Sequence, residues 1–319
     1  ELFLESINLH LRGDVPTCIS LSGGLDSSAI ACAVRYINPK SEINTFSYCP
    51  QGYDFNEEKW IDIINNHIKA IPHKFTIKPN EIIENFPSLI ESQDEPFSGS
   101  SIYCIFRTFA EASKFGYKVM LDGQGSDELF AGYHGYPYSY AKDLYNDEGI
   151  KELIVFCKEW SKMPNRGFKK AINIFASTII SKHTKLRPRI VQRILRRIKY
   201  LNYFSKSSFT IFKDYTDYFS PNFYENNFTN NLFESLTYNG LPNLLRTGDR
   251  SSMANSIESR VPFLNILLME FVLSLPNEFL LSKKGTTKYI LRKALNGIVP
   301  DEILNRKDKI GAITPNREL

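Results

Sequence analysis

A buried strand followed at once by a glycine turn and a helix constrains this chain more than any other feature. Residues 17–21 predict the strand, and residues 27–34 predict the helix. Between them stand Ser22, Gly23 and Gly24, and glycine lets a backbone turn sharply and approach a ligand closely. The first turn of a helix presents unpaired N–H groups with partial positive charge, so this turn predicts an anion site suited to phosphate.

Strands and helices alternate through the first 135 residues. Further strands are expected at 43–48, 73–77 and 118–121, and helices at 2–11, 60–68, 81–90 and 101–115. This alternation predicts an α/β fold with a doubly wound, mostly parallel sheet, in which ligands bind at the carboxyl ends of the strands. Both glycine-rich turns, 22–24 and 123–125, fall at such ends.

Residues 136–319 have long helical patterns. We therefore expect one domain over residues 1–319, with an α/β nucleotide-binding part at 1–135 and a mainly helical part at 136–319. Basic residues crowd the segment 187–199, where apolar residues recur at helical spacing. An RNA-binding or membrane-surface helix is one interpretation. A solvated helix with a core-facing stripe is the one we favour.

Composition narrows the class of protein. The 319 residues are 42% hydrophobic, enough for a substantial core, and 39 basic against 35 acidic residues give a net charge of only +4. This charge does not by itself indicate nucleic acid. The five cysteines form no C-x-x-C pair, and no apolar run is long enough to span a bilayer. We expect a cytoplasmic protein with no membrane or nucleic-acid partner, and the missing initiator Met suggests an excised fragment.

Four motifs follow one another along the chain. Residues 22–28 read SGGLDSS, residues 121–133 read LDGQGSDELFAGY, residues 245–264 read LRTGDRSSMANSIESRVPFL, and residues 285–295 read GTTKYILRKAL. The first lacks the Lys-Ser/Thr of a Walker loop, which argues against γ-phosphate transfer of the kinase type.

The first motif resembles the SGGxDS pyrophosphate loop of the N-type ATP pyrophosphatases. All four, in this order, resemble the synthetase domain of the asparagine synthetase B family, and residues 306–311 resemble its end. The resemblance implies an adenine nucleotide alpha hydrolase-like fold. It also implies a ligase that adenylates a carboxylate with ATP, releases pyrophosphate, and lets ammonia displace AMP to form an amide, with aspartate as the first expected acid and asparagine as its product.

The resemblance also assigns site residues. Catalytic roles fall to Lys288, Gln124 and Asp127, and Mg²⁺ to Asp26 and Asp127. The expected ATP and pyrophosphate contacts are Leu21, Ser22, Gly23, Gly24, Asp26, Ser27, Ser28, Tyr48, Gly123 and Lys288. Gly125, Ser126, Arg250 and Arg260 are candidates for the acid substrate. A guanidinium grips a carboxylate bidentately, but structural pairing of Arg250 or Arg260 with Asp249 or Glu258 is the interpretation we favour.

Three positions depart from the family pattern. Asp122 and Gln124 stand where the family usually has Ser and Glu, and Asn265 replaces an expected aspartate. The family glutamate is tied to handling the acyl-adenylate and ammonia, whereas an amide can neither accept a proton nor carry charge. Either ammonia is managed differently or the acceptor is another acid, such as a sugar acid or a peptide side chain.

The family resemblance also suggests partners and competing functions. Family members usually take ammonia from an upstream glutaminase domain, which this sequence lacks, so we expect one in the full-length protein. A homodimer is also considered. Two other classes stay open: a tRNA-modifying enzyme with a pyrophosphatase loop, which the absent C-x-x-C pair argues against, and a catalytically inactive regulatory relative.

Overall fold

The computed structural model describes residues 1–53, 56–97, 99, 101–164, 166–183 and 223–307, and it divides into two compact units. The first unit comprises Glu1–Phe130, Gly240–Leu275 and Ile290–Leu319, and the second comprises Ala131–Asn239 and Pro276–Tyr289. Segments far apart in the sequence therefore complete each unit.

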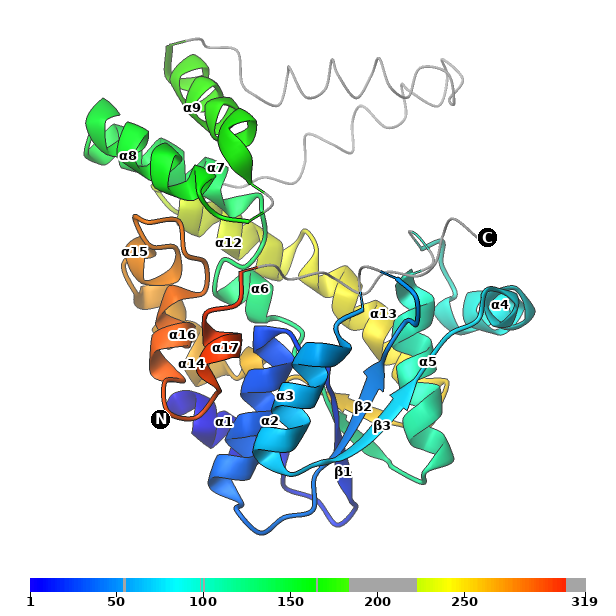
Figure 1. Ribbon diagram of the computed structural model, residues 1–319. Helices are drawn as coiled ribbons and strands as arrows, with labels where there is room; N and C mark the ends of the chain where they lie inside the picture. Colours follow the sequence, from blue (N-terminus) through cyan, green and yellow to red (C-terminus); the bar gives the residue numbers. More distant parts are fainter. Residues whose placement is uncertain (54–55, 98, 100, 165, 184–222, 308–319) are drawn as a thin grey trace, which may run out of the picture. The chain divides into compact units, whose positions relative to one another are not determined.

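A five-stranded parallel sheet lies in the first unit (Figure 1). The strands are β1 (Thr17–Ser20), β2 (Asn44–Tyr48), β3 (Ile71–Phe75), β4 (Val119–Leu121) and β5 (Glu258–Arg260), in the order β3-β2-β1-β4-β5. The register pairs Ile19 of the central strand with Thr45 on one side and with Leu121 on the other. The β4 strand is apolar and fully buried, as expected of a strand that helices cover on both faces, whereas Thr17 and Ser20 at the ends of β1 are half-buried.

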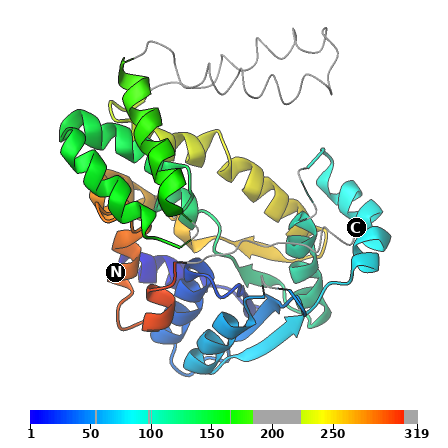
Figure 2. The ribbon, with the colours of Figure 1, turned by 45° about the horizontal axis from the view of Figure 1, so that its top comes forward.

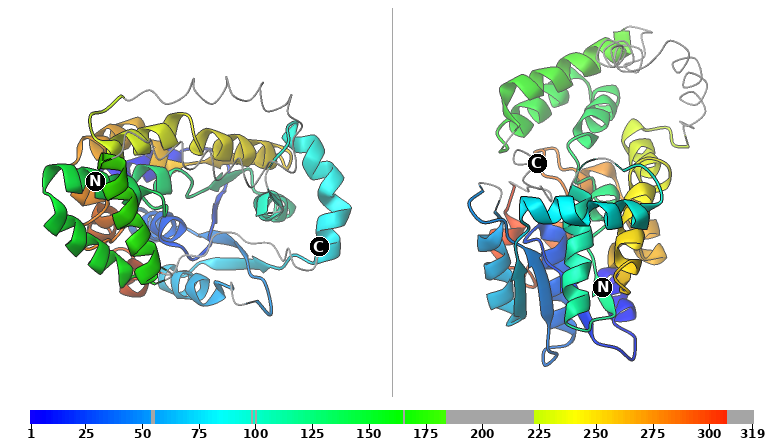
Figure 3. Two further views of the ribbon diagram at one scale, coloured as in Figure 1. Left: turned by 90° about the horizontal axis from the view of Figure 1, so that it is seen from above. Right: turned by 90° about the vertical axis from the view of Figure 1, so that its right-hand side faces the viewer.

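Helices cover both faces of this sheet. Figure 2 and Figure 3 show α3 (Glu58–Ile68) on one side, and α5 (Ser101–Lys114) and α13 (Leu241–Met253) on the other. The β1 strand leads into α2 (Leu25–Ile37), whose residues 25–34 are all buried. The reversal of strand order at β1 places the carboxyl ends of β1 and β4 side by side. Such a switch point is where open α/β sheets bind ligands.

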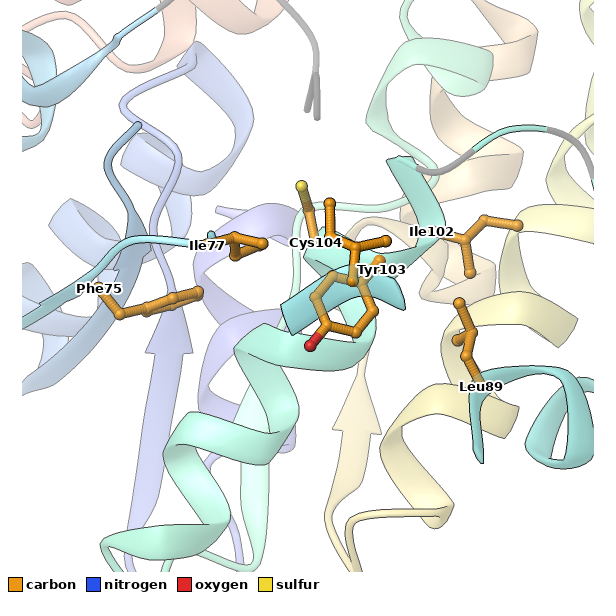
Figure 4. Packing of buried hydrophobic residues seen from close by; sticks show 7 residues of the cluster. Phe75, Ile77, Leu89, Ile102, Tyr103 and Cys104 are labelled. Atoms are coloured by element: carbon orange, nitrogen blue, oxygen red, sulfur yellow. The ribbon is translucent and has the colours of Figure 1, made fainter. Parts of the chain in front are cut away.

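The other elements of the first unit frame this layer. They are α1 (Leu2–His10), α4 (Pro79–Gln93), α6 (Ser126–Leu129), the 3₁₀ turn η1 (Pro262–Leu264), α14 (Ile266–Ser274), α16 (Tyr289–Ala294) and α17 (Asp301–Leu304), with Tyr289 itself in the second unit. Figure 4 shows how α4 and α5 pack: Leu89 and Ile102 lie across from each other, with Phe75 and Tyr103 in the same cluster. Tyr48, at the end of β2, packs against this cluster.

The described part of the second unit is helical. It holds α7 (Tyr136–Asp147), α8 (Ile150–Ser161), α9 (Gly167–His183), α12 (Asn227–Thr237) and α15 (Asn277–Leu280). Tyr140 and Phe228 meet edge to face with their ring centroids 5.5 Å apart. The buried Asp143 carboxylate accepts the backbone N–H groups of Asn227 at 2.9 Å and Phe228 at 2.7 Å. This carboxylate satisfies donors that the start of α12 leaves unpaired.

The predicted α/β fold with a doubly wound parallel sheet is confirmed. Four of the strands were predicted, β3 two residues later than it lies, whereas β5 was not indicated by the sequence.

All five cysteines are buried free thiols. No helix in the described ranges has the length and apolarity to cross a membrane. The basic segment 187–199 and residues 308–311 of the last resemblance lie outside the described residues.

Candidate active site

Hydroxyl groups close the turn between β1 and α2, which we call the first loop (residues 22–28). The backbone N–H of Ser22 donates to Ser27 Oγ at 3.1 Å, and the two hydroxyls lie 3.1 Å apart. Ser22 Oγ also accepts the N–H of Gly24 at 3.3 Å. No side chain caps α2 at Gly24. The serines therefore fix the loop, while the start of a buried 13-residue helix keeps its anion-attracting end without a side-chain cap.

Gly23 cannot be replaced without moving α3. Its φ of 72° lies in the left-handed region, and a Cβ at this position would come 2.8 Å from Trp60 Cβ and 3.0 Å from the Ile61 nitrogen. Backbone and Trp60 thus meet too closely for any side chain. The glycine therefore serves close packing of the first loop against α3.

The second loop (residues 122–127) runs from β4 into α6 and touches the first. A Cβ on Gly123 would lie 3.1 Å from Asp26 Cβ and 3.2 Å from the Ser27 nitrogen. Ser126 Oγ donates to Asp26 Oδ1 at 2.8 Å, and both residues are buried. The two motifs that the sequence placed at separate strand ends are therefore in direct contact.

The end of the third motif packs against the second loop. Gly125 has a φ of 87°, and a Cβ there would overlap the Leu264 side chain at 2.3 Å. Leu264 belongs to η1, whose Phe263 stacks on Phe3 with ring centroids 4.8 Å apart. Phe263 and Leu264, at the end of the third motif, thus connect α1 to the second loop. Their role is structural.

Charge gathers around Asp26. Burial raises the pKa of Asp122 to about 6, the N–H of Gly123 lowers it, and the nearby charge of Asp26 raises it again. Burial lowers the pKa of the Arg292 guanidinium, and Asp26 partly offsets that effect. Two carboxylates and one half-buried cation therefore share this end of the sheet. The repulsion between Asp26 and Asp122 is of the kind that a bound cation relieves.

Two predicted nucleotide contacts carry buried hydroxyls for which the described residues offer no hydrogen-bond partner. These are Ser28 Oγ, in the first turns of α2, and the Tyr48 hydroxyl at the end of β2. Burial is also the largest cause of the raised pKa of Tyr48. Since buried polar groups are nearly always satisfied, both positions suit a polar ligand or ordered water.

Both arginines proposed for the acid substrate make protein contacts. Arg260 binds Glu258 with Nε 2.7 Å from Oε1, and its Nη1 donates to the carbonyls of His10 and Arg12, each at 2.8 Å. Arg250 Nη1 lies 3.2 Å from Asp94 Oδ2. The pairing of Arg260 with Glu258 is the structural alternative that we favoured, whereas Arg250 pairs with Asp94 instead of Asp249.

Lys288 belongs to the second unit, where its loop is tightly held. It is 4% exposed and has a φ of 54°, which side-chain-bearing residues seldom adopt. Arg166 Nη1 donates to the Gly285 carbonyl at 2.9 Å, and its guanidinium lies over the Trp160 ring at 5.1 Å. A Cβ on Gly285 would lie 3.1 Å from Trp160 Cα. Gln124 and Asp127 are both half-buried on the second loop.

Three charged residues near the two loops were not predicted as site residues from the sequence. Asp122 was noted only as a departure, Arg292 only as a letter of the fourth motif, and Arg306 only within the last resemblance. Each is buried or half-buried and charged, yet a charged residue in a sequence carries no sign of its burial. The occurrence of Arg292 and Arg306 inside family-like segments was the available signal.

The fold and the two touching loops define an adenine nucleotide alpha hydrolase-like protein. Comparison with known proteins makes the assignment narrower, because the Asparagine synthase family profile matches residues 1–319. The chain belongs to the asparagine synthase family.

Three relatives illustrate this similarity. The glutamine-hydrolysing asparagine synthetase 1 of Bacillus subtilis strain 168 is 30% identical over 99% of this chain and 49% of its own length. A putative glutamine-hydrolysing asparagine synthetase of Mycobacterium tuberculosis strain H37Rv is 29% identical over 98% of this chain and 47% of its own. Amidase chyE of Penicillium rubens is 24% identical over 96% of this chain and 50% of its own. The chain thus spans about half the length of these relatives.

Proposed function

We propose that this chain is the amide-forming, ATP-consuming part of a glutamine-dependent amidotransferase. The observation that carries the proposal is the contact between the two loops, where Ser126 of the second motif binds Asp26 of the first at 2.8 Å. Both loops stand at the carboxyl ends of neighbouring parallel strands, the expected place for a nucleotide. In this proposal the first loop holds the pyrophosphate part of ATP.

The residues present fit a nucleotide. Two glycines, Gly23 and Gly123, stand where a Cβ would collide with protein, so both loops pack closely at the carboxyl ends of β1 and β4. The hydroxyls of Ser28 and Tyr48 have hydrogen-bonding capacity to spare within the described chain. A phosphate and a ribose offer the acceptors and hydroxyls that would use it.

The residues also fit Mg²⁺. In the described part of the chain no three His, Cys, Asp or Glu side chains gather as a metal site. Mg²⁺ does not need such a cage, because it is held by one or two carboxylates and keeps waters and phosphate oxygens as its other ligands. We propose Asp26 and Asp127 as the carboxylates, with the repelling Asp122 beside Asp26. The metal would supply charge compensation to the phosphates.

The proposed reaction has two steps. An oxygen of the substrate carboxylate attacks the α-phosphorus of ATP, and pyrophosphate leaves. Ammonia then attacks the carbonyl carbon of the acyl-adenylate, loses a proton and expels AMP, giving an amide. The buried Lys288 compensates the negative charge that develops on phosphate, a role in which a point charge serves well. Positioning and charge compensation suffice, and no covalent enzyme nucleophile is required.

Two acceptors compete within this proposal. Aspartate is the first, because two of the relatives carry asparagine synthetase in their names. A different acid is the second, favoured by Gln124 and Asp122 in the second loop and by the relative named as an amidase. For the full-length protein we propose a glutaminase domain as the ammonia source, because these relatives are about twice as long as this chain.

A pyrophosphate-release assay tests the proposal. The chain receives MgATP, ammonia and one acid at a time, from aspartate through sugar acids to peptides with acidic side chains, and the released pyrophosphate and amide are both measured. We expect release with a single acid class, and none from Asp26→Asn in a protein whose circular dichroism is unchanged. Release equal in wild type and Asp26→Asn would discredit the site, and no release with any acid would favour the inactive-relative alternative.

A further inference from the structure

Arg306 contacts the first loop from the far end of the chain. Its Nη1 donates to the Gly23 carbonyl at 2.9 Å, its Nη2 forms an ion pair with Glu57, and its guanidinium carbon lies 4.8 Å from the centre of the Trp60 ring. The residue is 7% exposed. The roles proposed above leave this buried arginine without a function.

These contacts fix one peptide plane of the loop. A trans peptide is planar, so the Gly23 carbonyl and the Gly24 N–H point to opposite sides. Arg306 holds the carbonyl, and the N–H donates to Ser22 Oγ at 3.3 Å. A rotation of this peptide would break both bonds at once. The orientation of the Gly23–Gly24 peptide is therefore set by contacts within the protein.

The surroundings of Arg306 favour geometry over net charge as its contribution. Glu57 neutralises the guanidinium, and the Trp60 face holds it flat. Trp60 also blocks any side chain at Gly23, where φ is already 72°. A lysine would keep the charge but not the planar fork that reaches a carbonyl and a carboxylate together.

We propose that Arg306 is a positioning residue that holds the first loop in its phosphate-binding form. It acts through the Gly23 peptide and touches no reacting atom. A loop ordered in advance spares the ligand the ordering penalty, so loss of Arg306 weakens binding of the pyrophosphate part of the nucleotide. This inference rests on the proposed function, in which that loop binds ATP.

The test measures binding by titration calorimetry with the whole chain. The probes are the magnesium complex of α,β-methylene-ATP, which carries the pyrophosphate part and resists cleavage, and AMP, which lacks that part. The variants are Arg306→Gln and Arg306→Lys. Arg306→Gln is expected to lower the affinity for the triphosphate analogue by about tenfold, because a charged hydrogen-bond donor is lost. It is expected to lower the affinity for AMP by less than about twofold. The affinity of Arg306→Lys for the triphosphate analogue is expected to be closer to that of Arg306→Gln than to that of wild type.

Arg35 offers a matched control on α2, the helix that follows the first loop. It donates from Nε to the Ile68 carbonyl at 2.7 Å and from Nη1 to the carbonyls of Pro39 and Ser41 at 2.7 and 2.9 Å. It lies at the end of α2 that is remote from the first loop. Arg35→Gln therefore removes an arginine that organises backbone carbonyls, yet both nucleotides should bind as in wild type.

Each outcome decides between the ideas. Equal analogue affinity in wild type and Arg306→Gln overturns the inference and leaves the proposed function standing. An equal loss of analogue and AMP affinity also overturns it, because a general structural defect would do the same. Absence of analogue binding to wild type overturns both. If Arg306→Gln does not fold, Arg306→Lys and Glu57→Gln take its place, and selective loss of the analogue in either supports the inference while wild-type affinity in both refutes it.

Discussion

Close packing is what requires a glycine at position 123, because its φ lies outside the left-handed region that favours glycine. Its missing Cβ is what lets the second loop come so close to the first that a Cβ here would lie 3.1 Å from Asp26 Cβ and 3.2 Å from the Ser27 nitrogen. The obstructing atoms belong to the first turn of a buried helix, so they have little freedom to move away.

Gly123→Ala should therefore push the two loops apart. We expect a stability loss of about 1–3 kcal/mol from overpacking and a ten- to hundredfold fall in pyrophosphate release, roughly what small misplacements produce in active sites. Denaturant unfolding and the release assay measure the two effects.

Gly248→Ala is the control for this substitution. Gly248 lies within α13, and a Cβ added there would point into open space, so alanine should raise stability by about 0.5–1 kcal/mol and leave the rate unchanged. Wild-type kinetics in Gly123→Ala would mean that close approach of the loops is not needed.

Lys288 combines a proposed chemical role with an unfavourable backbone conformation. Its φ of 54° is accessible to glycine without penalty and to other residues at about 1 kcal/mol. We expect Lys288→Ala and Lys288→Gly both to abolish amide formation, because each removes the charge. The glycine variant should nevertheless be the more stable of the two by about 1 kcal/mol.

Comparing the two variants with each other removes the contribution of the lost side chain. Urea unfolding of both proteins measures the difference. An alanine variant as stable as the glycine variant would show that the positive φ carries no strain, and amide formation in either would discredit the role of the ammonium group.

At the scale of elements, Asn265 shows how a departure from the family pattern is accommodated. Its Oδ1 accepts the N–H groups of Leu267 at 3.1 Å and Leu268 at 3.3 Å, which caps α14. Asparagine and aspartate cap helices about equally well. The replacement therefore preserves the structural function that the family aspartate would serve at this position.

Asn265→Asp should accordingly leave stability and acceptor choice unchanged. Asn265→Ala should lower stability by about 1 kcal/mol because two backbone donors lose their acceptor. Thermal unfolding and the acid screen measure the outcome. A changed acceptor in Asn265→Asp would show that this residue reads the substrate, contrary to the capping interpretation.

Elements were predictable where the sequence carries a local signal. The β4 strand is an apolar run, β1 has an apolar centre, and both stand beside glycine turns. Helix α2 follows directly from its small and apolar residues. By contrast β5 is Glu258, Ser259 and Arg260, three polar residues inside a motif. It is a strand because it pairs with β4, with the Asp122 N–H donating to the Arg260 carbonyl at 2.8 Å. Such pairing depends on tertiary structure, which local propensity does not report.

At the scale of the whole chain, the candidate site depends on segments that the sequence could not bring together. Leu264 fills the space beside Gly125, and Arg306 binds the loop 283 residues before it. The motifs indicated candidate site residues but not these contacts. For the same reason the compact unit that holds the sheet includes residues 240–275 and 290–319, which the sequence grouped with the helical part.

A ligand that binds only the folded protein must raise its melting temperature, which gives a test that needs no acceptor acid. We expect magnesium with α,β-methylene-ATP to stabilise the chain by about 2.7 kcal/mol at a hundredfold excess over its dissociation constant. Chelation by EDTA should remove most of this gain, because the metal offsets the repulsion between the carboxylates and the phosphates. Asp26→Asn should show little gain with or without chelator, since it lacks the carboxylate that the proposal assigns to the metal. A full gain that survives both EDTA and Asp26→Asn would place nucleotide binding on other residues.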